Sequence, residues 1–378
     1  MNATKPPNSP FRMPKPVPPE SHLSAGQPRR NNLDLMRLAL AVVVLFSHSF
    51  QVAQGNYLGE PLVSLLRHDN FMTLGTTAVC GFFALSGFVI TVSWQRNPSW
   101  RRFLANRVRR IYPGFLAIMA LQSFLVAPFV TLAPPQFYTL KQLAVLGAEM
   151  LFLLPYGAPF NNLLAVFPHN PEHGSLSLNP PLWTLRYEFW CYLLVLAIGL
   201  TGWLRRRWLT AALFIIIWVV LASGVSLPWH RVLTAAFGQS LPWPRLLACF
   251  LSGVVFAVNR ELIPHSTRFA IVAAVVLAVG SVSFRLGLEA VFPIAGTYLL
   301  FWFGFHPTLR LERLTRWGDF SYGTYLYGFP IQQLFVHWFP GRLGPWTLFA
   351  CALPMTLVMA ALSWHLVEKR FLRRQPVA

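Results

Sequence analysis

The chain has 378 residues, of which 55% are hydrophobic and only 11% charged, and its formal net charge at pH 7 is +19. Soluble domains carry about 25% charged residues, so this composition excludes an ordinary soluble protein and indicates one that lies in a membrane. A basic excess is also typical of nucleic-acid-binding proteins, so the position of the basic residues along the chain has to decide between the two.

Residues 1–30 are rich in proline and polar residues, and we expect them to form a disordered tail. Beyond them, apolar runs are interpreted as membrane-spanning helices, because a hydrocarbon core of roughly 30 Å needs about 20 apolar residues. A shorter stretch, 140–155, ends in proline and is interpreted as re-entrant or lying along the surface. The ten predicted spans are 33–53, 71–94, 111–132, 182–201, 208–226, 244–259, 269–286, 288–305, 320–338 and 345–367.

The basic residues gather between alternate spans. If the N-terminus lies inside the cell, 23 of the 31 lysines and arginines fall in inner segments, five in outer segments and three within spans. This is the positive-inside pattern of membrane proteins, so no nucleic-acid partner is expected. The sequence therefore predicts an all-α, polytopic membrane bundle of about ten helices with both termini in the cytoplasm. Its domains would be a tail at 1–30, a transmembrane domain at 31–370 and a basic tail at 371–378.

The first span contains ionisable residues that need a reason to be there. A helix places Arg37 and His48 on one face, about 16 Å apart along its axis, because eleven residues make three turns plus roughly 20°. Asp34 precedes Arg37 by three residues and can pair with it. Charged groups in hydrocarbon usually mark a site. From the residues alone, however, Arg37 serves equally well as an interfacial anchor, and a lone histidine is often a structural core residue.

Other polar residues in or near the spans are less specific. Glu188 lies at the outer end of the fourth span and points away from Arg186, so it needs a partner from another helix or the substrate. Ser86, within an aromatic span, can hydrogen-bond across a helix contact. Five arginines between Arg101 and Tyr112 form an inner loop beside a predicted helix N-terminus, which suits phosphate groups or anionic lipid headgroups equally.

No metal site is expected. His169 and His173 have the i, i+4 spacing of zinc ligands, but Pro171 between them argues against the helix that this spacing requires.

Taken together in chain order, five motifs resemble those of the membrane acyltransferase-3 family, the integral-membrane acyltransferases that commonly O-acetylate bacterial surface polysaccharides. The resemblance covers essentially the whole chain after residue 30. The motifs are weak one by one and strong as an ordered set. They are matched by Asp34, Arg37 and His48; by Phe82 to Phe88; by Arg107, Arg109, Arg110 and Tyr112-Pro113; by Trp183, Thr184, Leu185 and Glu188; and by Ser321, Tyr322 and Tyr325.

The resemblance implies an enzyme of the bacterial inner membrane that uses cytoplasmic acyl-CoA, expected to be acetyl-CoA, and acylates a hydroxyl on a surface glycan such as lipopolysaccharide or on a lipid-linked glycan. On this hypothesis His48 acts as general base or as nucleophile, and Glu188 orients the imidazole or the acceptor. The CoA phosphates would lie among Arg37, Arg107, Arg109 and Arg110. Structural or substrate-positioning roles fall to Asp34, Ser86, Trp183, Ser321, Tyr322 and Tyr325.

One position departs from the family pattern. Many relatives have a histidine where this chain has Gly328, so either that histidine is dispensable or this chain has a different acceptor. Two alternatives stay open. A transporter or flippase for a lipid-linked glycan would also have about ten spans and buried ionisable residues, but would be expected to show repeated broken helices. A family member could also acylate a small molecule or a lipid.

Overall fold

The computed structural model describes residues 31–66, 72–126, 139–153, 178–224, 243–283, 287–306, 308, 309, 311 and 315–372. The predicted tail at 1–30, most of the predicted tail at 371–378, and the histidine pair His169 and His173 lie outside the described residues. Within them the regular elements are helices and no β-strand is present, which confirms the predicted all-α class.

The helices are α1 (Leu33–Gln54), α2 (Pro61–Leu66), α3 (Leu74–Arg96), α4 (Trp100–Leu121), α6 (Leu140–Phe152), α8 (Trp183–Leu200), α9 (Arg207–Ser223), α11 (Trp243–Asn259), α12 (Thr267–Ser283), α13 (Gly287–Val291), α14 (Thr297–Gly304), α15 (Ser321–Trp338), α16 (Pro345–Ser363) and α17 (Lys369–Phe371). Short 3₁₀ turns lie at Pro180–Leu182 (η4) and Trp203–Arg205 (η5), and π-helical turns at Gln122–Val126 (η1), Phe292–Gly296 (η6) and Trp364–Glu368 (η8).

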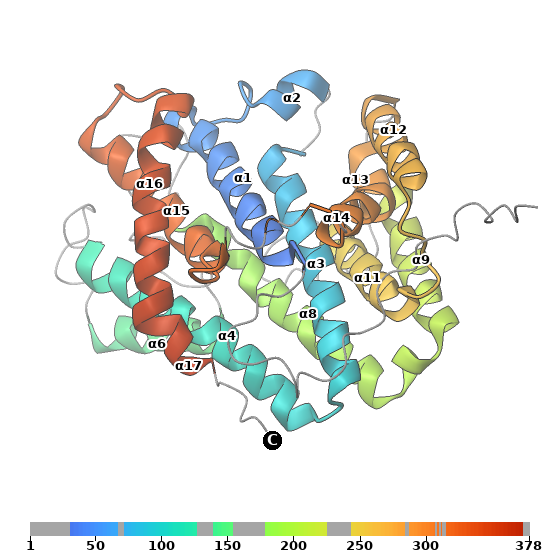
Figure 1. The fold of residues 1–378 in the computed structure, drawn as a ribbon. Coiled ribbons are helices and arrows are strands. Elements are labelled where there is room, and N and C mark those ends of the chain that lie inside the picture. Colours follow the sequence, from blue (N-terminus) through green and yellow to red (C-terminus); the bar gives the residue numbers. More distant parts are fainter. Residues whose placement is uncertain are drawn as a thin grey trace, which may run out of the picture.

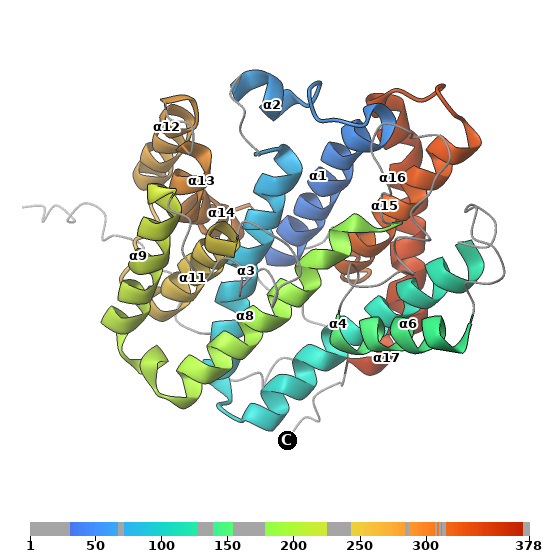
Figure 2. The ribbon, with the colours of Figure 1, turned by 180° about the vertical axis from the view of Figure 1, so that it is seen from behind.

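Helices α1 and α3 form the centre of the bundle (Figure 1). Helices α15 and α16 pack on one side of α1, and α11, itself covered by α9, packs against α3 on the other. From behind, α8 runs obliquely across the bundle (Figure 2). The helix α2 lies at one end of the molecule, and α4 and α17 lie at the other. The bundle therefore has two distinct ends, joined by α1.

Within the described residues, each predicted span overlaps a helical segment. Among the described residues, four segments are both long and apolar enough to cross a membrane: Leu33–Gln54, Leu74–Arg96, Gly287–Gly304 and Pro345–Phe371. Ten crossings and the orientation of the termini stay predictions. The short α6 has 13 residues. It is about 20 Å long at 1.5 Å per residue, which is too short to cross, as expected for the 140–155 stretch.

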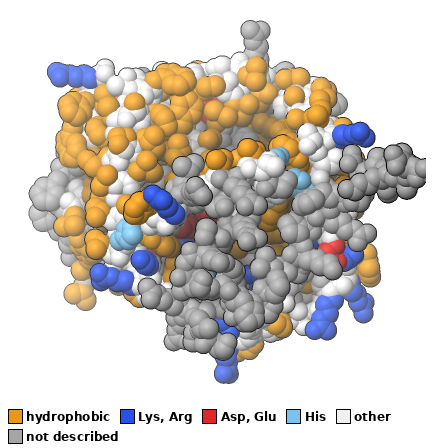
Figure 3. Space-filling model, in the orientation of Figure 1, with side chains coloured by type: hydrophobic (Ala, Val, Ile, Leu, Met, Phe, Trp, Pro, Cys, Tyr) orange, Lys and Arg blue, Asp and Glu red, His pale blue; other side chains and the backbone are white. Residues whose placement is uncertain are grey.

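The surface is that of a protein surrounded by apolar solvent. Hydrophobic side chains cover most of the described surface in Figure 3, and most of the lysines and arginines visible there lie in the half that contains α4. Large apolar side chains that are about half exposed recur along α9, α12 and α16, among them Ile215, Ile216, Val219, Val272, Val275, Val279, Met355, Val358 and Leu362. Soluble proteins rarely expose such continuous apolar faces.

The arginine-rich segment is a helix and not the predicted inner loop. Helix α4 begins at Trp100, eleven residues before the predicted start of the third span at residue 111, and carries Pro113 in its interior. The prediction was wrong because arginine, leucine and alanine between Trp100 and Arg110 are good helix formers, and a proline removes only one backbone hydrogen bond from a helix that packing stabilises. The predicted helix N-terminus beside Tyr112 therefore does not exist.

Two glycines set the crossing of α3 and α11. A Cβ atom on Gly87 would lie 2.0 Å from the carbonyl oxygen of Phe250, and one on Gly253 would lie 2.0 Å from that of Ala84. Close backbone approach through small residues is the usual way in which membrane helices pack. The small residue in the Phe82–Phe88 motif thus has a structural reason.

Replacing Gly87 by alanine should destabilise the protein by about 2 kcal/mol, because the helices must move apart to admit the methyl group. Helix propensity alone would make the alanine variant more stable, because it favours alanine over glycine by about 1 kcal/mol. Gly147→Ala in α6 is the matched control, since a Cβ there meets nothing within 4 Å. Thermal unfolding of both variants in detergent measures the difference, and equal stability would contradict the close crossing.

Candidate active site

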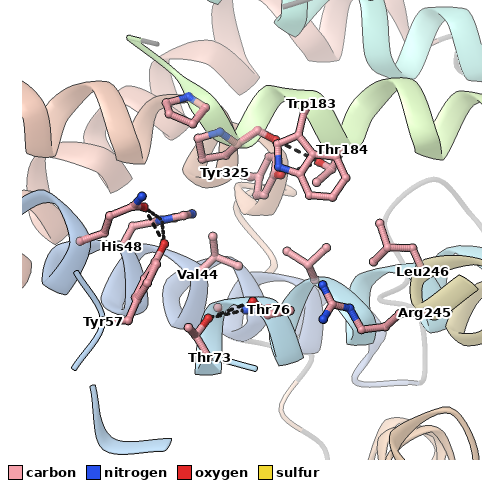
Figure 4. A pocket seen from close by; sticks show the side chains of 15 residues that line it. Val44, His48, Tyr57, Thr73, Thr76, Trp183, Thr184, Arg245, Leu246 and Tyr325 are labelled. Atoms are coloured by element: carbon pink, nitrogen blue, oxygen red, sulfur yellow. Dashed lines mark hydrogen bonds between the residues drawn. The ribbon is translucent and has the colours of Figure 1, made fainter. Parts of the chain in front are cut away.

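His48 lines a cavity of about 260 Å³ between α1, α3, α8, α11 and α15. Val44 and Gln51 line it from α1, Thr76 from α3 and Tyr325 from α15. Figure 4 shows His48 at one end of the cavity and Arg245 of α11 at the other. The first catalytic candidate of the sequence therefore lies where a substrate has room to bind.

A triangle of hydrogen bonds fixes the imidazole. His48 Nδ1 lies 3.1 Å from the hydroxyl of Tyr57 and 3.3 Å from Oε1 of Gln51. The Tyr57 hydroxyl donates its proton to Gln51 Oε1 at 2.6 Å, the shortest of the three contacts. Both oxygen atoms facing Nδ1 therefore offer lone pairs, so the neutral imidazole carries its proton on Nδ1. The lone pair of Nε2 is left for chemistry, and the ring packs edge-on against Phe329 at 5.1 Å between centroids.

The turn after α1 brings Tyr57 back over the helix. Gly55 ends α1 with φ of 77°, a left-handed conformation that glycine adopts without strain. Glu60, fully buried in the same loop, accepts hydrogen bonds of 2.6 Å from both Ser47 Oγ and the backbone N–H of Leu74. The carboxylate thus fastens the loop to α1 and to the start of α3, and Tyr57 is held in place over His48.

The opposite wall comes from the start of α8 and from α15. The Tyr325 hydroxyl donates to the carbonyl of Pro181 at 2.6 Å and contacts Thr184 Oγ1 at 2.5 Å. Trp183 also lines the cavity and packs edge-on against Tyr187. The structure therefore places Trp183 and Tyr325, both predicted to position substrate, in the wall that faces His48 (Figure 4).

Glu188 does not lie at the cavity. It accepts hydrogen bonds from Ser86 at 3.0 Å and from Tyr192 at 2.5 Å, and it follows Thr184 by one turn of α8, about 6 Å further from the cavity. Among the described residues no contact joins Glu188 to His48, whose Nδ1 is held by Tyr57 and Gln51 instead. The hypothesis that Glu188 orients the imidazole therefore has no geometric support, and its link to Ser86 is the inter-helix bond foreseen for that serine.

A charge cluster surrounds Arg37 at the other end of α1. Asp319 lies 3.9 Å from Arg37 and 2.6 Å from Arg110, and Asp34 lies 3.9 Å from Arg37. Arg110 also lies 3.8 Å from Glu368. Burial opposes the ionisation of Asp319, but the positive charges of Arg110 and Arg37 outweigh it and lower the pKa of Asp319 to about 2. Three carboxylates thus compete with any incoming anion for these guanidiniums.

The three arginines of α4 are not equivalent. Arg107 donates to Ser93 at 3.2 Å and lies over the ring of Tyr192, and its buried Nε has no hydrogen-bond partner in the part of the chain that the structure describes. Burial, with smaller contributions from Arg37 and Arg110, lowers the pKa of Arg107. Arg109 follows Arg107 by two residues and so points to nearly the opposite side of α4. The expected group of three arginines around one ligand is therefore divided between two sides of the helix.

The serine–tyrosine motif at the start of α15 fixes this helix. Ser321 donates to Asp319 through both its backbone N–H and its hydroxyl. The Tyr322 hydroxyl donates to the carbonyl of Ile111 at 2.8 Å, and the guanidinium of Arg110 lies over the Tyr322 ring. Both residues thus hold α15 against α4, at a distance from the cavity that Tyr325 lines.

Gly328 marks a close contact between α15 and α1. A Cβ atom there would lie 2.8 Å from Cδ1 of Leu45, so a larger residue would require α1 to shift. The next residue, Phe329, contacts the His48 ring. The departure from the family pattern at Gly328 is therefore accompanied by direct packing of α15 on the helix that carries His48.

The cavity residues that were not singled out from the sequence include Gln51, Tyr57 and Arg245. Gln51 follows His48 by three residues, and this spacing places both side chains on one face of a helix, so the sequence could have indicated the contact. Tyr57 reaches His48 only because the chain turns at Gly55, which no periodicity reveals. Arg245 is one of the three basic residues that fall within predicted spans, and nothing more in the sequence marks it.

Replacing Asp319 by asparagine should lower the free energy of unfolding at pH 7 by about 2 kcal/mol, because the neighbouring arginines hold the pKa of its carboxyl at about 2, below the ordinary value for aspartate. The carboxylate is mostly buried, with 16% of its side chain exposed. Because its folded pKa lies below the unfolded value of about 3.9, its contribution is present above pH 4 and is lost as the pH falls toward 2. Thermal unfolding in detergent at pH 7 measures the loss.

Asp34→Asn is the control for this prediction. Asp34 is more exposed, at 30%, and its carboxylate lies 3.9 Å from the guanidinium of Arg37, which is long for an ion pair. A partly exposed pair at this distance contributes less than about 1 kcal/mol. Equal destabilisation by the two variants would mean that Asp319 does not organise the cluster.

Comparison with known proteins adds an independent observation. Over residues 30–365 the chain matches a protein family described as "Acyltransferase domain". It is 27% identical over 357 residues to a protein of Shigella phage Sf6 named O-acetyl transferase, covering 92% of this chain and 97% of the relative. It is 27% identical over 369 residues to Nodulation protein 10 of Rhizobium leguminosarum bv. viciae, covering 93% and 95% respectively. No solved structure matches the chain.

Proposed function

The chain belongs to the membrane acyltransferase-3 family, and its similarity to a protein named O-acetyl transferase supports an O-acetyltransferase. We propose that it moves an acetyl group from cytoplasmic acetyl-CoA to a hydroxyl of a surface or lipid-linked polysaccharide. The observation that carries the proposal is the layout of α1. This helix has Arg37 in a charge cluster near one end and His48 in a cavity near the other.

The proposal includes a topology. Ten helical segments cross the inner membrane of a bacterium, both termini lie in the cytoplasm, and the end with α4 faces inward. Its support is the predominance of lysine and arginine at that end in Figure 3, as the positive-inside rule requires. The Arg37 cluster then lies on the cytoplasmic side and the His48 cavity toward the outer side.

The donor would bind along α1. The CoA phosphates would contact Arg37, with Arg107 and Arg110 close by and Arg109 at the edge, and would displace Asp319 from Arg37 as they bind. About 16 Å along the helix axis separates Arg37 from His48, a length that the extended pantetheine arm can span. The thioester is thereby presented in the cavity while the nucleotide stays on the inner side.

With its proton on Nδ1, the imidazole of His48 can act as a base through Nε2. The lone pair on Nε2 takes the proton of the acceptor hydroxyl as its oxygen attacks the thioester carbonyl carbon. The C–S bond then breaks, and the imidazolium returns that proton to the departing thiolate of CoA. Tyr57 and Gln51 keep the Nδ1 proton in place throughout, as the orienting group does in other histidine bases. The same lone pair also suits a nucleophilic route through an acetyl-imidazole, which trapping of an acetylated protein would reveal.

The comparisons support acyl transfer over transport. The Shigella phage relative is named O-acetyl transferase, which supports acyl transfer to oxygen. A transporter of lipid-linked glycans finds no support in the family match. A small-molecule or lipid acceptor within the same family is an outcome that the first experiment below distinguishes, because it follows the label to its product.

His48→Ala should reduce acetyl transfer by at least about a hundredfold, because a positioned general base contributes 10²–10⁴ to the rate. Membranes are incubated with labelled acetyl-CoA, and label is measured in glycans, lipids and small molecules. His337→Ala is the control, since this histidine lies in the last turn of α15 and not at the cavity. Activity retained by His48→Ala with a folded protein would overturn the catalytic role.

Arg37→Ala should raise the KM for acetyl-CoA about tenfold or more, since a charge-assisted hydrogen bond to phosphate contributes roughly 1.5–3 kcal/mol. The KM for the acceptor should change far less, because Arg37 lies at the other end of α1. Steady-state kinetics on the purified protein separates the two constants. An unchanged donor KM would contradict the placement of CoA along α1.

A further inference from the structure

Arg245 is a charged residue of the cavity that the proposed chemistry does not use. Only 7% of its surface is exposed, yet it lines the cavity at the end opposite His48 (Figure 4). Among the described lining residues, Arg245 alone carries a formal charge at pH 7 when His48 is neutral. Its Nη1 donates to Glu289 of α13 at 2.6 Å and contacts the sulfur of Met72 at 3.3 Å.

Packing alone does not explain this ion pair. Two charges inside an apolar bundle lose more solvation than their attraction easily restores, and apolar residues of similar volume often hold helices together as well. Ionisable residues at membrane depth usually face a cavity and mark a path or a site. Within the described residues the buried Nε of Arg245 has no hydrogen-bond partner, so the ion pair with Glu289 does not satisfy every donor of the guanidinium. Because Arg245 also lines the cavity, its guanidinium is placed to bind a ligand there.

The charge balance defines what it can bind. Arginine offers donors only, so its ligand must present oxygen atoms as acceptors. Glu289 does not line the cavity and already neutralises the guanidinium. A carboxylate or phosphate added beside this balanced pair would bring an uncompensated charge into a medium of low dielectric constant. Hydroxyl, ring or amide oxygens of an uncharged molecule would not.

The size and the lining of the cavity further restrict the kind of ligand that it can hold. A volume of about 260 Å³ lies just below the usual range for small-ligand sites, roughly 300–1,000 Å³, and suits one ring and not an oligomer. Trp183 supplies an aromatic face between the two ends of the cavity. An aromatic plane beside charge-assisted donors is an arrangement that fits the apolar face and the hydroxyls of a sugar ring.

We propose that Arg245, balanced by Glu289, forms with Trp183 a subsite for a single uncharged sugar residue, whose reacting hydroxyl then lies at His48. This subsite rests on the proposed function, since it holds the acceptor of that reaction. Arg245 fixes the oxygen atoms at the far side of the ring, Trp183 packs on its face, and the enzyme selects uncharged over acidic sugars.

Binding and transfer are measured separately on the purified full-length protein. The probes are methyl glucoside, which is uncharged, and methyl glucuronide, which carries a carboxylate on the same ring. Thermal unfolding with each glycoside reports binding without chemistry, because a ligand that binds the folded state raises its stability. Labelled acetyl-CoA reports transfer to the glycoside relative to its hydrolysis by water.

Wild-type protein should be stabilised by methyl glucoside and much less by methyl glucuronide. The double variant Arg245→Gln/Glu289→Gln removes both charges at once and so leaves no unpaired buried ion. It should weaken glucoside binding about tenfold or more and lower the ratio of transfer to hydrolysis by a similar factor, the effect of losing charge-assisted hydrogen bonds. Glu289→Gln alone leaves an unbalanced guanidinium and should shift the preference toward the glucuronide.

The matched control is Arg207→Gln/Glu261→Gln. This pair is also an arginine and a glutamate, at 3.5 Å, but its side chains are exposed by 46% and 56% and lie outside the cavity. It should change neither binding nor the transfer ratio.

Three results would overturn the subsite: wild-type preference for the glucuronide, no stabilisation by either glycoside, or equal glucoside binding by wild type and the double variant. Failure of the proposed function is distinguishable, because the protein would then bind glucoside without turning over acetyl-CoA.

Discussion

The structure depends on how the polar groups of one apolar helix are satisfied inside the bundle. In hydrocarbon an unpartnered guanidinium or a misdirected imidazole is costly, so α1 determines what must surround it. Near one end Arg37 draws in Asp319, which in turn holds Arg110 and the start of α15. Near the other end His48 requires Tyr57 and Gln51 on one side and leaves Nε2 free for chemistry on the other.

The rest of the bundle serves these two ends. The close crossing of α3 and α11 through Gly87 and Gly253 brings Arg245 to the cavity that His48 lines from α1. Contact between α15 and α1 at Gly328 brings Phe329 against the imidazole. Glycines at the helix contacts therefore determine how close the side chains around the cavity lie to one another.

Much of the fold could be predicted from the sequence because hydrophobic runs are a local signal. Each predicted span overlaps a helix in the described part of the chain. Arg37 and His48 lie near the two ends of α1, and Trp183 and Tyr325 line the cavity beside His48. The start of α4 was missed because arginine counts as a loop residue in a hydropathy profile, although it is a good helix former.

The remaining misses need three-dimensional information. Glu188 and His48 both lie in predicted motifs, but a one-turn offset along α8 separates the carboxylate from the cavity. Tyr57 depends on a left-handed turn at Gly55, and Arg245 depends on a helix crossing. Such contacts join residues far apart in the chain or on opposite sides of a turn, and no alternation of apolar and polar residues records them.

The most direct measurement of the central claim is an experimental structure with a non-hydrolysable acetyl-CoA analogue, in which a ketone replaces the thioester. The phosphates of the analogue should lie at Arg37 and its carbonyl carbon in the cavity, within about 4 Å of the position where a hydroxyl hydrogen-bonded to His48 Nε2 would attack. An analogue bound with both its phosphates and its carbonyl at one end of α1 would rule out this placement of the donor.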